Sequence, residues 1–333
     1  MTARSVKEAF EGFSRLRIMI IGDVMVDSYL WGKVERISPE APVPIVTCTN
    51  REDRLGGAAN VALNIRSLGA SALLCSVIGN DTAGKIFIKL LKQNKMETAG
   101  ILYDPARKTT QKTRIISSNQ HLLRVDEEDT HYLQPHTETM LLEAVRGLIS
   151  RIKIDAVIFQ DYDKGVITPR IIEETSKLFQ ETGIPVLVDP KKRNFNLYRN
   201  ATVFKPNFRE FAEGVKADIS RNDKEGITRE ASAFLQKTGH KYLLLTLSEQ
   251  GVFMSDGRES HHIPAHVRDI ADVSGAGDTV ISVAALCFAS GLSPLVTAEI
   301  VNLAGGIVCE KVGVVPVDRE QLLQESLQLD FVK

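Results

Sequence analysis

The sequence has no excess of charge of either sign. Its 333 residues include 41 Lys and Arg and 42 Asp and Glu, which gives a formal net charge of −1. Proteins that bind nucleic acid or an anionic membrane normally carry a clear basic excess, so we expect neither partner. Any anionic ligand must therefore be held by a local concentration of positive charge.

Cysteines and long hydrophobic runs are also scarce. The cysteines lie far apart without a Cys-x-x-Cys pair, so we expect no disulfide framework and no zinc site, and interpret them as buried thiols in a reducing compartment. They are Cys48, Cys75, Cys287 and Cys309. The most apolar stretch, 280–289, is about half the length of a membrane span. The charged segment 4–17 does not resemble a signal peptide, so the sequence predicts a cytoplasmic protein.

Short apolar runs alternate with helical patterns along most of the chain. The runs predict strands at 17–22, 72–78, 155–159, 185–188, 202–204 and 242–247, and the patterns predict helices at 57–68, 81–93, 136–151, 169–181 and 225–238. Strands interleaved with helices are typical of an α/β fold with a largely parallel sheet. No Gly-x-Gly-x-x-Gly follows the first strand, which argues against a dinucleotide-dependent oxidoreductase.

Two segments break this alternation. Residues 28–50 contain three prolines and then a β-rich run, and residues 108–126 read as two strands joined at 118–120. Neither segment has a helical partner, so we expect an antiparallel addition to the main sheet; the alternative is a pair of long surface loops. With no internal repeat or low-complexity linker, we predict one domain over 1–333 with a discontinuous β lid from 28–50 and 108–126.

The segment 272–278, Asp-Val-Ser-Gly-Ala-Gly-Asp, is the most informative motif. Its glycines permit a tight turn whose amides point at one locus, and these amides open a helix, where the dipole favours an anion. Asp278 could then take a proton from an alcohol while the amides of Gly275, Ala276 and Gly277 hold phosphoryl oxygens. The alternative is that Asp278 only caps the helix and the glycines only form a turn.

A second glycine pair, Gly56-Gly57, opens another helix that carries Asn60 in its first turn. Its alternative interpretation is close packing of the helix on a strand. Asp23 and Asp27 follow the first strand, at the edge where open α/β sheets bind ligands.

Two further turns precede helices. Asn207 and Glu210 open a helix after a strand, and they also fit a variant of the capping box. The segment 79–86 matches a P-loop except that Ile86 replaces the Ser or Thr, so we interpret it as a strand-to-helix turn with Asp81 as N-cap. The basic run 191–193 is most simply a solvated loop.

Both glycine signatures, with 207–210 and 246–251 between them in this order, resemble the ribokinase-like (PfkB-type) carbohydrate kinase family from about residue 15 to about residue 320. The resemblance implies a three-layer α/β sandwich with a mostly parallel central sheet and a small β lid. It also implies direct in-line transfer of a phosphoryl group from ATP to a sugar hydroxyl.

A narrower resemblance concerns the sugar. The segments 36–44, 56–62 and 161–165 are similar to those of family members that phosphorylate D-glycero-β-D-manno-heptose 7-phosphate at the anomeric hydroxyl, for ADP-heptose and lipopolysaccharide core synthesis. Some members are fused to a C-terminal nucleotidyltransferase. Because this chain ends at Lys333, the resemblance implies the kinase half alone, with its product passed to a separate phosphatase and nucleotidyltransferase.

The resemblance also implies roles for single residues. Asp278 would be the base, and the amides of Gly275, Ala276 and Gly277 would stabilise the transferred phosphoryl group. The remaining implied roles are sugar binding by Asp27 and Asn60 with Gly56 and Gly57; contact with the ATP phosphates and, through water, Mg²⁺ by Asn207 and Glu210; contact with the nucleotide by Ser248, Gly251 and Asn302; and binding of a monovalent cation such as K⁺ by Asp272 and Ser274.

The phosphate of the substrate needs local cations in a nearly neutral protein. Lys164 follows a strand and is one candidate, and the other three, on the lid, are Arg124, Lys112 and Arg114. The alternative is that they are solvated lid charges. The exposed lid strands could pair with those of a second copy, so we predict a homodimer.

Other functions remain open on the sequence. A kinase for another sugar, such as fructose or ribose, or for a nucleoside would carry the same two signatures. A protein of this fold that binds sugar or nucleotide without turnover is the alternative from a different class.

Overall fold

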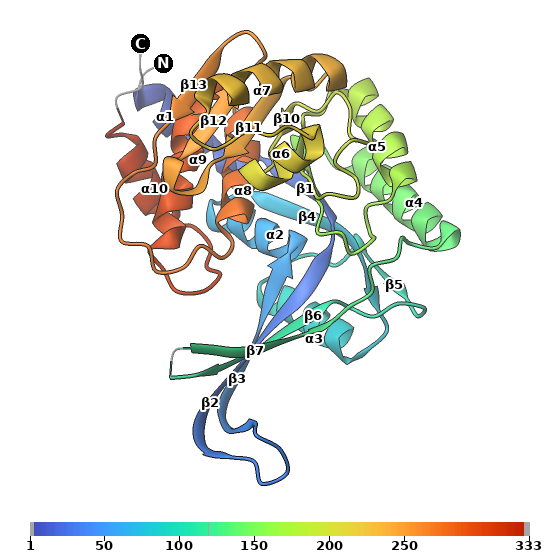
Figure 1. The fold of residues 1–333 in the computed structure, drawn as a ribbon. Helices are drawn as coiled ribbons and strands as arrows, with labels where there is room; N and C mark the ends of the chain where they lie inside the picture. Colours follow the sequence, from blue (N-terminus) through green and yellow to red (C-terminus); the bar gives the residue numbers. More distant parts are fainter. Residues whose placement is uncertain (1–2, 119, 330–333) are drawn as a thin grey trace.

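The computed structural model describes residues 3–118 and 120–329, and its centre is a nine-stranded sheet (Figure 1). The strand order is β13-β12-β11-β10-β9-β8-β1-β4-β5. The bounds are β1 (Arg17–Gly22), β4 (Ser71–Gly79), β5 (Ile101–Asp104), β8 (Ala156–Gln160), β9 (Val186–Asp189), β10 (Val203–Phe204), β11 (Tyr242–Thr246), β12 (Val252–Ser255) and β13 (Ser260–Ile263). Neighbours from β5 to β11 are parallel, whereas the β11–β12 and β12–β13 pairs are antiparallel. The predicted largely parallel sheet is confirmed.

Helices cover both faces of this sheet. One face packs against α1 (Ala3–Gly12), α2 (Ala58–Ser67), α3 (Thr82–Gln93), α8 (Ala276–Ala289), α9 (Pro294–Cys309) and α10 (Arg319–Ser326). The other packs against α4 (Pro135–Arg151), α5 (Pro169–Thr182), α6 (Phe208–Val215) and α7 (Lys224–Thr238). Two short 3₁₀ helices complete the fold, η1 (Phe13–Arg15) and η2 (Ser248–Gln250).

The first strand shows why such strands read as continuous apolar runs. Ile18 and Ile20 belong to the core under one helical layer, while Met19 and Ile21 belong to the core under the other. Successive side chains of a strand point to opposite faces, so a strand covered on both sides must be apolar at every position. The predicted three-layer sandwich is confirmed.

The two segments that break the alternation form a second sheet of four strands, with the order β3-β2-β6-β7. The strands are β2 (Val24–Ile37), β3 (Pro44–Gly57), β6 (Gln111–Ser117) and β7 (Gln120–Glu127). The alternative of two surface loops is therefore wrong, although Asn119 of the predicted turn lies outside the described residues. In Figure 1 this lid extends from the body, and the β2–β3 hairpin forms its far end.

Two details of the predicted lid are wrong. The lid strands form their own sheet and do not extend the main one, and the central pair β2–β6 is parallel. Both strands leave the body in the same direction, β2 directly after β1 and β6 soon after β5, so they lie parallel.

The centre of the main sheet is also its topological switch point. After β1 the chain continues to β4 and β5 on one side, and from β8 onward it continues to the other side. Gly22 and Gln160 pair at the carboxyl ends of β1 and β8, and a Cβ on Gly22 would lie 2.1 Å from the Gln160 carbonyl oxygen. Open α/β sheets bind ligands outside such a point.

The interpretation of all four cysteines as buried is wrong for Cys48. Cys48 is exposed because it lies on β3 in the hairpin, away from both cores, whereas Cys75, Cys287 and Cys309 are buried. Burial raises the pKa of the Cys75 thiol to about 12. Within residues 3–118 and 120–329 we find no helix with the length and apolarity needed to cross a membrane.

Candidate active site

Asp278 lies in the first turn of α8, at the carboxyl end of the main sheet. Its side chain is buried, and three side chains donate hydrogen bonds to it. The Tyr162 hydroxyl and the Gln160 amide donate to Oδ1 at 2.6 Å and 3.1 Å, and the Asn60 amide donates to Oδ2 at 2.7 Å. The residue that caps α8 is Gly275, so the alternative in which Asp278 is the helix cap is not what the structure shows.

The surroundings of Asp278 suit a general base. Burial raises the pKa of Asp278 to about 6, although the hydrogen bonds from Tyr162 and Asn60 act in the opposite direction. Burial also raises the pKa of Tyr162 well above its usual value, so its hydroxyl stays protonated. A base with a pKa near the working pH is ionised yet still basic enough to accept a proton.

The start of α8 also forms a site suited to an anion. Gly275 has a φ of 81°, a left-handed conformation in which glycine pays no steric penalty. The amides of Gly275, Ala276 and Gly277 lie at the helix N-terminus, where backbone donors lack partners in the helix. The Lys205 ammonium lies close by, 3.7 Å from where a Cβ on Gly277 would stand, and 3.1 Å from Asp189.

The first glycine signature brings the predicted sugar-binding residues together. A Cβ on Gly56 would lie 2.2 Å from the Asp27 carboxylate, and a Cβ on Gly57 would lie 2.5 Å from the Asp23 carbonyl oxygen. The glycines therefore permit β3 and the start of α2 to approach these acids, and Asn60 reaches Asp278 from the same helix.

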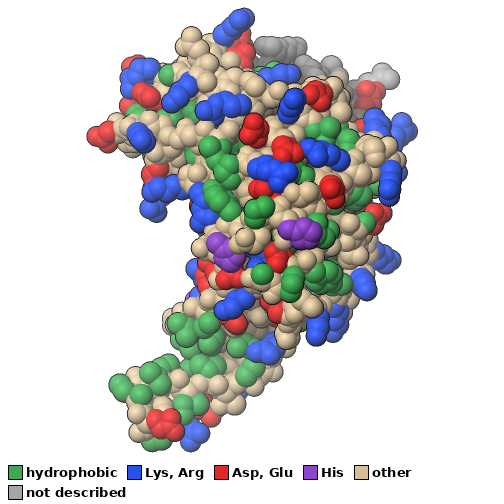
Figure 2. All heavy atoms as spheres, turned by 90° about the vertical axis from the view of Figure 1, so that its right-hand side faces the viewer, with side chains coloured by type: hydrophobic (Ala, Val, Ile, Leu, Met, Phe, Trp, Pro, Cys, Tyr) green, Lys and Arg blue, Asp and Glu red, His purple; other side chains and the backbone are tan. Residues whose placement is uncertain are grey.

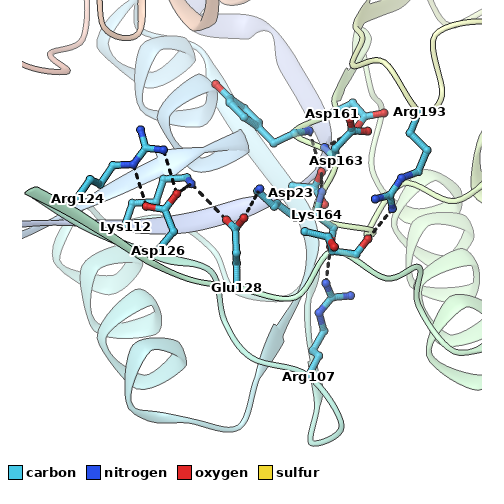
Figure 3. A network of polar contacts seen from close by, with 12 residues as sticks. Asp23, Arg107, Lys112, Arg124, Asp126, Glu128, Asp161, Asp163, Lys164 and Arg193 are labelled. Carbon is cyan, nitrogen blue, oxygen red and sulfur yellow. Dashed lines mark hydrogen bonds and ion pairs between the residues drawn. The ribbon is translucent and has the colours of Figure 1, made fainter.

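The candidate phosphate-binding cations all take part in ion pairs, and Figure 3 shows those of Arg124, Lys112 and Lys164 as a chain of alternating charge. Lys164 lies 2.7 Å from Glu128, and Lys112 contacts Glu128 at 3.2 Å and Asp126 at 2.7 Å. Arg124 binds Asp126 through two hydrogen bonds, at 2.9 Å and 3.0 Å. The fourth candidate, which is Arg114, pairs with Asp27 at 2.5 Å. The Lys112 and Lys164 side chains are 14% and 16% exposed, so these two are not simply solvated, whereas that of Arg124 is 56% exposed.

Asn207 and Glu210 form a complete capping box at the start of α6. Each side chain accepts a hydrogen bond of 2.9 Å from the backbone amide of the other residue. The Glu210 carboxylate also pairs with Lys191, whose ammonium lies 5.7 Å from the centre of the Tyr162 ring. The interpretation of 191–193 as a solvated loop is therefore wrong for Lys191.

The other predicted nucleotide residues lie on two separate elements, and the predicted cation residues lie in the turn before α8. Ser248 and Gly251 bound the short helix after β11, and Asn302 on α9 donates to the Pro264 carbonyl at 2.7 Å. Asp272 accepts 2.9 Å hydrogen bonds from the amides of Ser274 and Gly313.

Sequence reasoning missed four polar residues around Asp278. They are Gln160, Tyr162, Asp189 and Lys205. Three of them end or directly follow apolar strands that are otherwise fully buried. A polar residue at the end of such a strand indicates a functional site, and this pattern could have identified them from the sequence. The fourth, Tyr162, lies in the motif 161–165, which carried only the resemblance.

The doubly covered, mostly parallel sheet carries at its carboxyl edge a buried carboxylate, a glycine turn at a helix start and a lysine nearby, which are groups that a phosphotransferase can use. The pfkB family carbohydrate kinase model matches residues 15–320 of this chain. The chain therefore belongs to the pfkB family of carbohydrate kinases, enzymes that transfer a phosphoryl group to a hydroxyl group of a sugar.

Curated relatives extend over nearly the whole chain. It is 38% identical over 327 residues to the "Bifunctional protein HldE" of Geotalea uraniireducens, covering 98% of this chain and 66% of that protein. It is 40% identical over 311 residues to the protein of the same name from Desulfatibacillum aliphaticivorans, covering 93% and 63%. The chain thus spans slightly under two thirds of these relatives.

Solved structures share the fold. Phosphofructokinase-2 from Escherichia coli in complex with fructose-6-phosphate superposes with a TM-score of 0.76 at 18% identity, covering 94% of this chain and 98% of that one. Arabidopsis thaliana ribokinase complexed with ribose and ATP gives 0.72 at 16% identity, covering 95% and 99%.

Proposed function

We propose that this carbohydrate kinase phosphorylates a sugar phosphate, most specifically D-glycero-β-D-manno-heptose 7-phosphate at its anomeric hydroxyl, with ATP as donor. The observation that carries this proposal is the buried Asp278 carboxylate beside the α8 amides and next to a lid that carries several cations. The similarity to proteins named HldE supports the choice of sugar. That the product is passed on to a phosphatase and a nucleotidyltransferase in the cytoplasm belongs to the same proposal.

In the proposed reaction Asp278 accepts the proton of the attacking hydroxyl. The amides of Gly275, Ala276 and Gly277, together with the Lys205 ammonium, then stabilise the charge on the transferred phosphoryl group. Phosphoryl transfer depends mostly on such positioning and electrostatic stabilisation. A positioned base contributes ~10²–10⁴-fold to the rate, and one lost anion-site donor costs ~3 kcal/mol.

The family implies ATP and a divalent metal ion, and we propose Mg²⁺. Over residues 3–118 and 120–329 there is no cluster of three or more His, Cys, Asp or Glu that could hold a metal. This fits Mg²⁺, which in kinases binds substrate phosphates, water and one or two carboxylates. Glu210 would hold it through water, and the ion would neutralise phosphate charge. We further propose that Asp272 and Ser274 border a K⁺ site.

We propose that the phosphate of the substrate binds between Lys112 and Lys164. In the structure Lys164 donates to Oε1 and Lys112 to Oε2 of one carboxylate, that of Glu128. A phosphate offers the same oxygen acceptors with more charge, so it would take the place of this carboxylate. Arg124, at the exposed end of the ion-pair chain, would add to the attraction.

We propose that the lid also forms a homodimer. Every residue of β7 is exposed, and this strand is an edge of the lid sheet. Figure 2 shows the lid as a narrow arm with hydrophobic side chains on its surface. The large hydrophobic residues that are exposed on the described part of the lid are Val34, Ile37, Val43, Leu122, Leu123 and Val125. Light scattering should give a dimer that Leu123→Lys weakens; a fully active monomer would refute this.

A substrate panel tests the proposed function. ADP release should be measured with heptose 7-phosphate, fructose 6-phosphate, fructose, ribose and a nucleoside, using Asp278→Asn as the blank. We expect turnover to be highest with heptose 7-phosphate. Lys164→Gln should raise KM for the phosphorylated sugar but not for ATP, and Lys192→Gln, at an 83% exposed side chain, is the matched control. Preference for an unphosphorylated sugar, or no turnover at all, would refute the proposal.

A further inference from the structure

Asp23 is a buried aspartate that separates β1 from β2. Its carboxylate accepts three backbone hydrogen bonds from the loop after β8, residues 161–166. Figure 3 shows Asp23 beside Asp161, Asp163 and Lys164 of this loop. Tyr162 and Lys164 donate to Oδ2 at 2.8 Å and 3.1 Å, and Val166 donates to Oδ1 at 2.9 Å. One side chain thus holds every second amide of this loop.

The conformation of the loop explains the pattern. Asp163 and Gly165 have φ values of 56° and 87°, in the left-handed region that non-glycine residues rarely adopt. Backbone amides brought together by such turns form a concave site for an anion. Here the acceptor is the protein's own carboxyl group: burial raises the pKa of Asp23, and the three backbone hydrogen bonds act in the opposite direction.

The loop is also held from its opposite side. The Arg107 guanidinium donates to the Lys164 carbonyl oxygen at 2.5 Å, so the Lys164 residue is bound at its amide by Asp23 and at its carbonyl by Arg107. Arg107 is buried and lies in the segment that leads from β5 to the lid strand β6. The loop is therefore fixed between the main sheet and the base of the lid.

The main chain of Asp23 connects to the rest of the site. Its amide donates to the Gln160 carbonyl at 3.1 Å, and its carbonyl accepts from the Ala58 amide at 2.9 Å. Ala58 opens α2, the helix that carries Asn60. Together with the tyrosine of the loop, Gln160 and Asn60 are the side chains that hydrogen-bond the proposed base.

We propose that Asp23 is a positioning residue for phosphoryl transfer, which fixes the Tyr162 hydroxyl against Asp278 and the Lys164 ammonium at the substrate phosphate. It touches no reacting atom. The inference rests on Asp278 acting as the base, as in the proposed function. Displacement of a catalytic group by about 1 Å can cost about 10²-fold in rate, so a loosened loop should lower kcat.

The test is Asp23→Asn, which keeps the shape but offers an amide nitrogen to backbone N–H groups. We expect kcat to fall about tenfold to hundredfold while KM for ATP changes by less than about twofold. Because the Tyr162 hydrogen bond lowers the pKa of Asp278, its loss should move the acid limb of the kcat–pH profile to higher pH. The charged groups that also act on Asp278, Asp189 and Lys205, are unchanged in this variant.

Two further variants separate positioning from mere stability. Tyr162→Phe should move the acid limb in the same direction, and the double variant should move it no further than the larger single shift. Asp104→Asn is the matched control, because Asp104 is a buried aspartate that binds Ala106 and Thr137 at the end of β5. Asp104→Asn should leave the acid limb of the kcat–pH profile at the same pH as in the parent.

Any of three results would overturn the proposal. The first is a folded Asp23→Asn variant whose kcat and acid limb equal those of the parent, and the second is an equal effect from Asp104→Asn. The third is a double variant in which the acid limb moves by the sum of the shifts seen with Asp23→Asn and Tyr162→Phe alone. If Asp23→Asn does not fold, Arg107→Met replaces it; a lower kcat with a shifted limb supports the proposal, and unchanged values overturn it. An active Asp278→Asn would instead remove the proposed base itself, so the two failures are distinguishable.

Discussion

Asp278→Asn should give an enzyme that is far less active and yet more stable. Burial raises the pKa of Asp278 from 3.8 to about 6, although the hydrogen bonds from Tyr162 and Asn60 act in the opposite direction. A difference of about two pH units corresponds to about 3 kcal/mol in favour of the neutral form in the folded protein. Asparagine is neutral at every pH, so it avoids this cost.

The direction of the pKa shift of Asp278 decides at which pH the two proteins differ in stability. In the unfolded chain the carboxyl titrates near its ordinary pKa of 3.8, and in the folded protein near 6. The neutral form stabilises the fold fully below the lower value, and this stabilisation is lost as pH rises through the higher one. Asp278→Asn should therefore gain up to about 3 kcal/mol relative to the parent at about pH 8, and progressively less as the pH falls below 6.

Urea unfolding of both proteins at about pH 8 and about pH 5 measures this. The change in the stability difference between the two pH values isolates the charge, because altered packing of the amide contributes equally at both. The kcat of the same variant should be ~10²–10⁴-fold lower than that of the parent, while a fluorescent nucleotide still binds. A stability difference that is independent of pH, or normal turnover, would refute the assignment of Asp278 as a destabilised base.

Three further predictions concern neighbouring groups. The kcat/KM of the parent should fall tenfold per pH unit below about pH 6, and a profile that is flat down to pH 4.5 would contradict the raised pKa of Asp278. Gly275→Ala would place its Cβ 3.2 Å from the Asn60 amide, so this variant should have a lower kcat than the control Gly291→Ala. Gly291 has a similar φ, but a Cβ there would meet nothing within 4 Å. Equal decreases in kcat would exclude the contact with Asn60 as the cause. Glu128→Gln removes the negative charge that pairs with Lys112 and Lys164, so it should lower KM for a phosphorylated sugar. Measured by ADP release, we expect a decrease of about threefold to tenfold relative to the exposed control Glu127→Gln. An increase in KM would show that the carboxylate helps to build the site.

Sequence reasoning predicted the sheet because its strands are buried on both faces. Runs such as β1 and β4 are apolar at nearly every position, and turns with Asp81 or Asn207 as cap fix where the following helices begin. It also found both glycine turns, since glycine at a left-handed φ or a close approach leaves a local signature.

What it could not predict depends on contacts between distant segments. The lid pairing is one example, because strands that are half exposed carry no pattern that specifies a parallel partner more than eighty residues away, as between Ser28 and Thr113. The partners of Asp278 are another, since Tyr162 and Asn60 lie 116 and 218 residues from it in sequence. No local motif records which polar side chain will meet another across the switch point of a sheet.

The exposed thiol on the lid hairpin has a practical consequence. Cys48 is exposed, whereas the other three cysteines are buried and burial raises the pKa of each of their thiols. A maleimide dye or spin label at neutral pH should therefore attach at this one position without any engineered cysteine. The chain can thus report the motion of its own lid, in solution and during turnover.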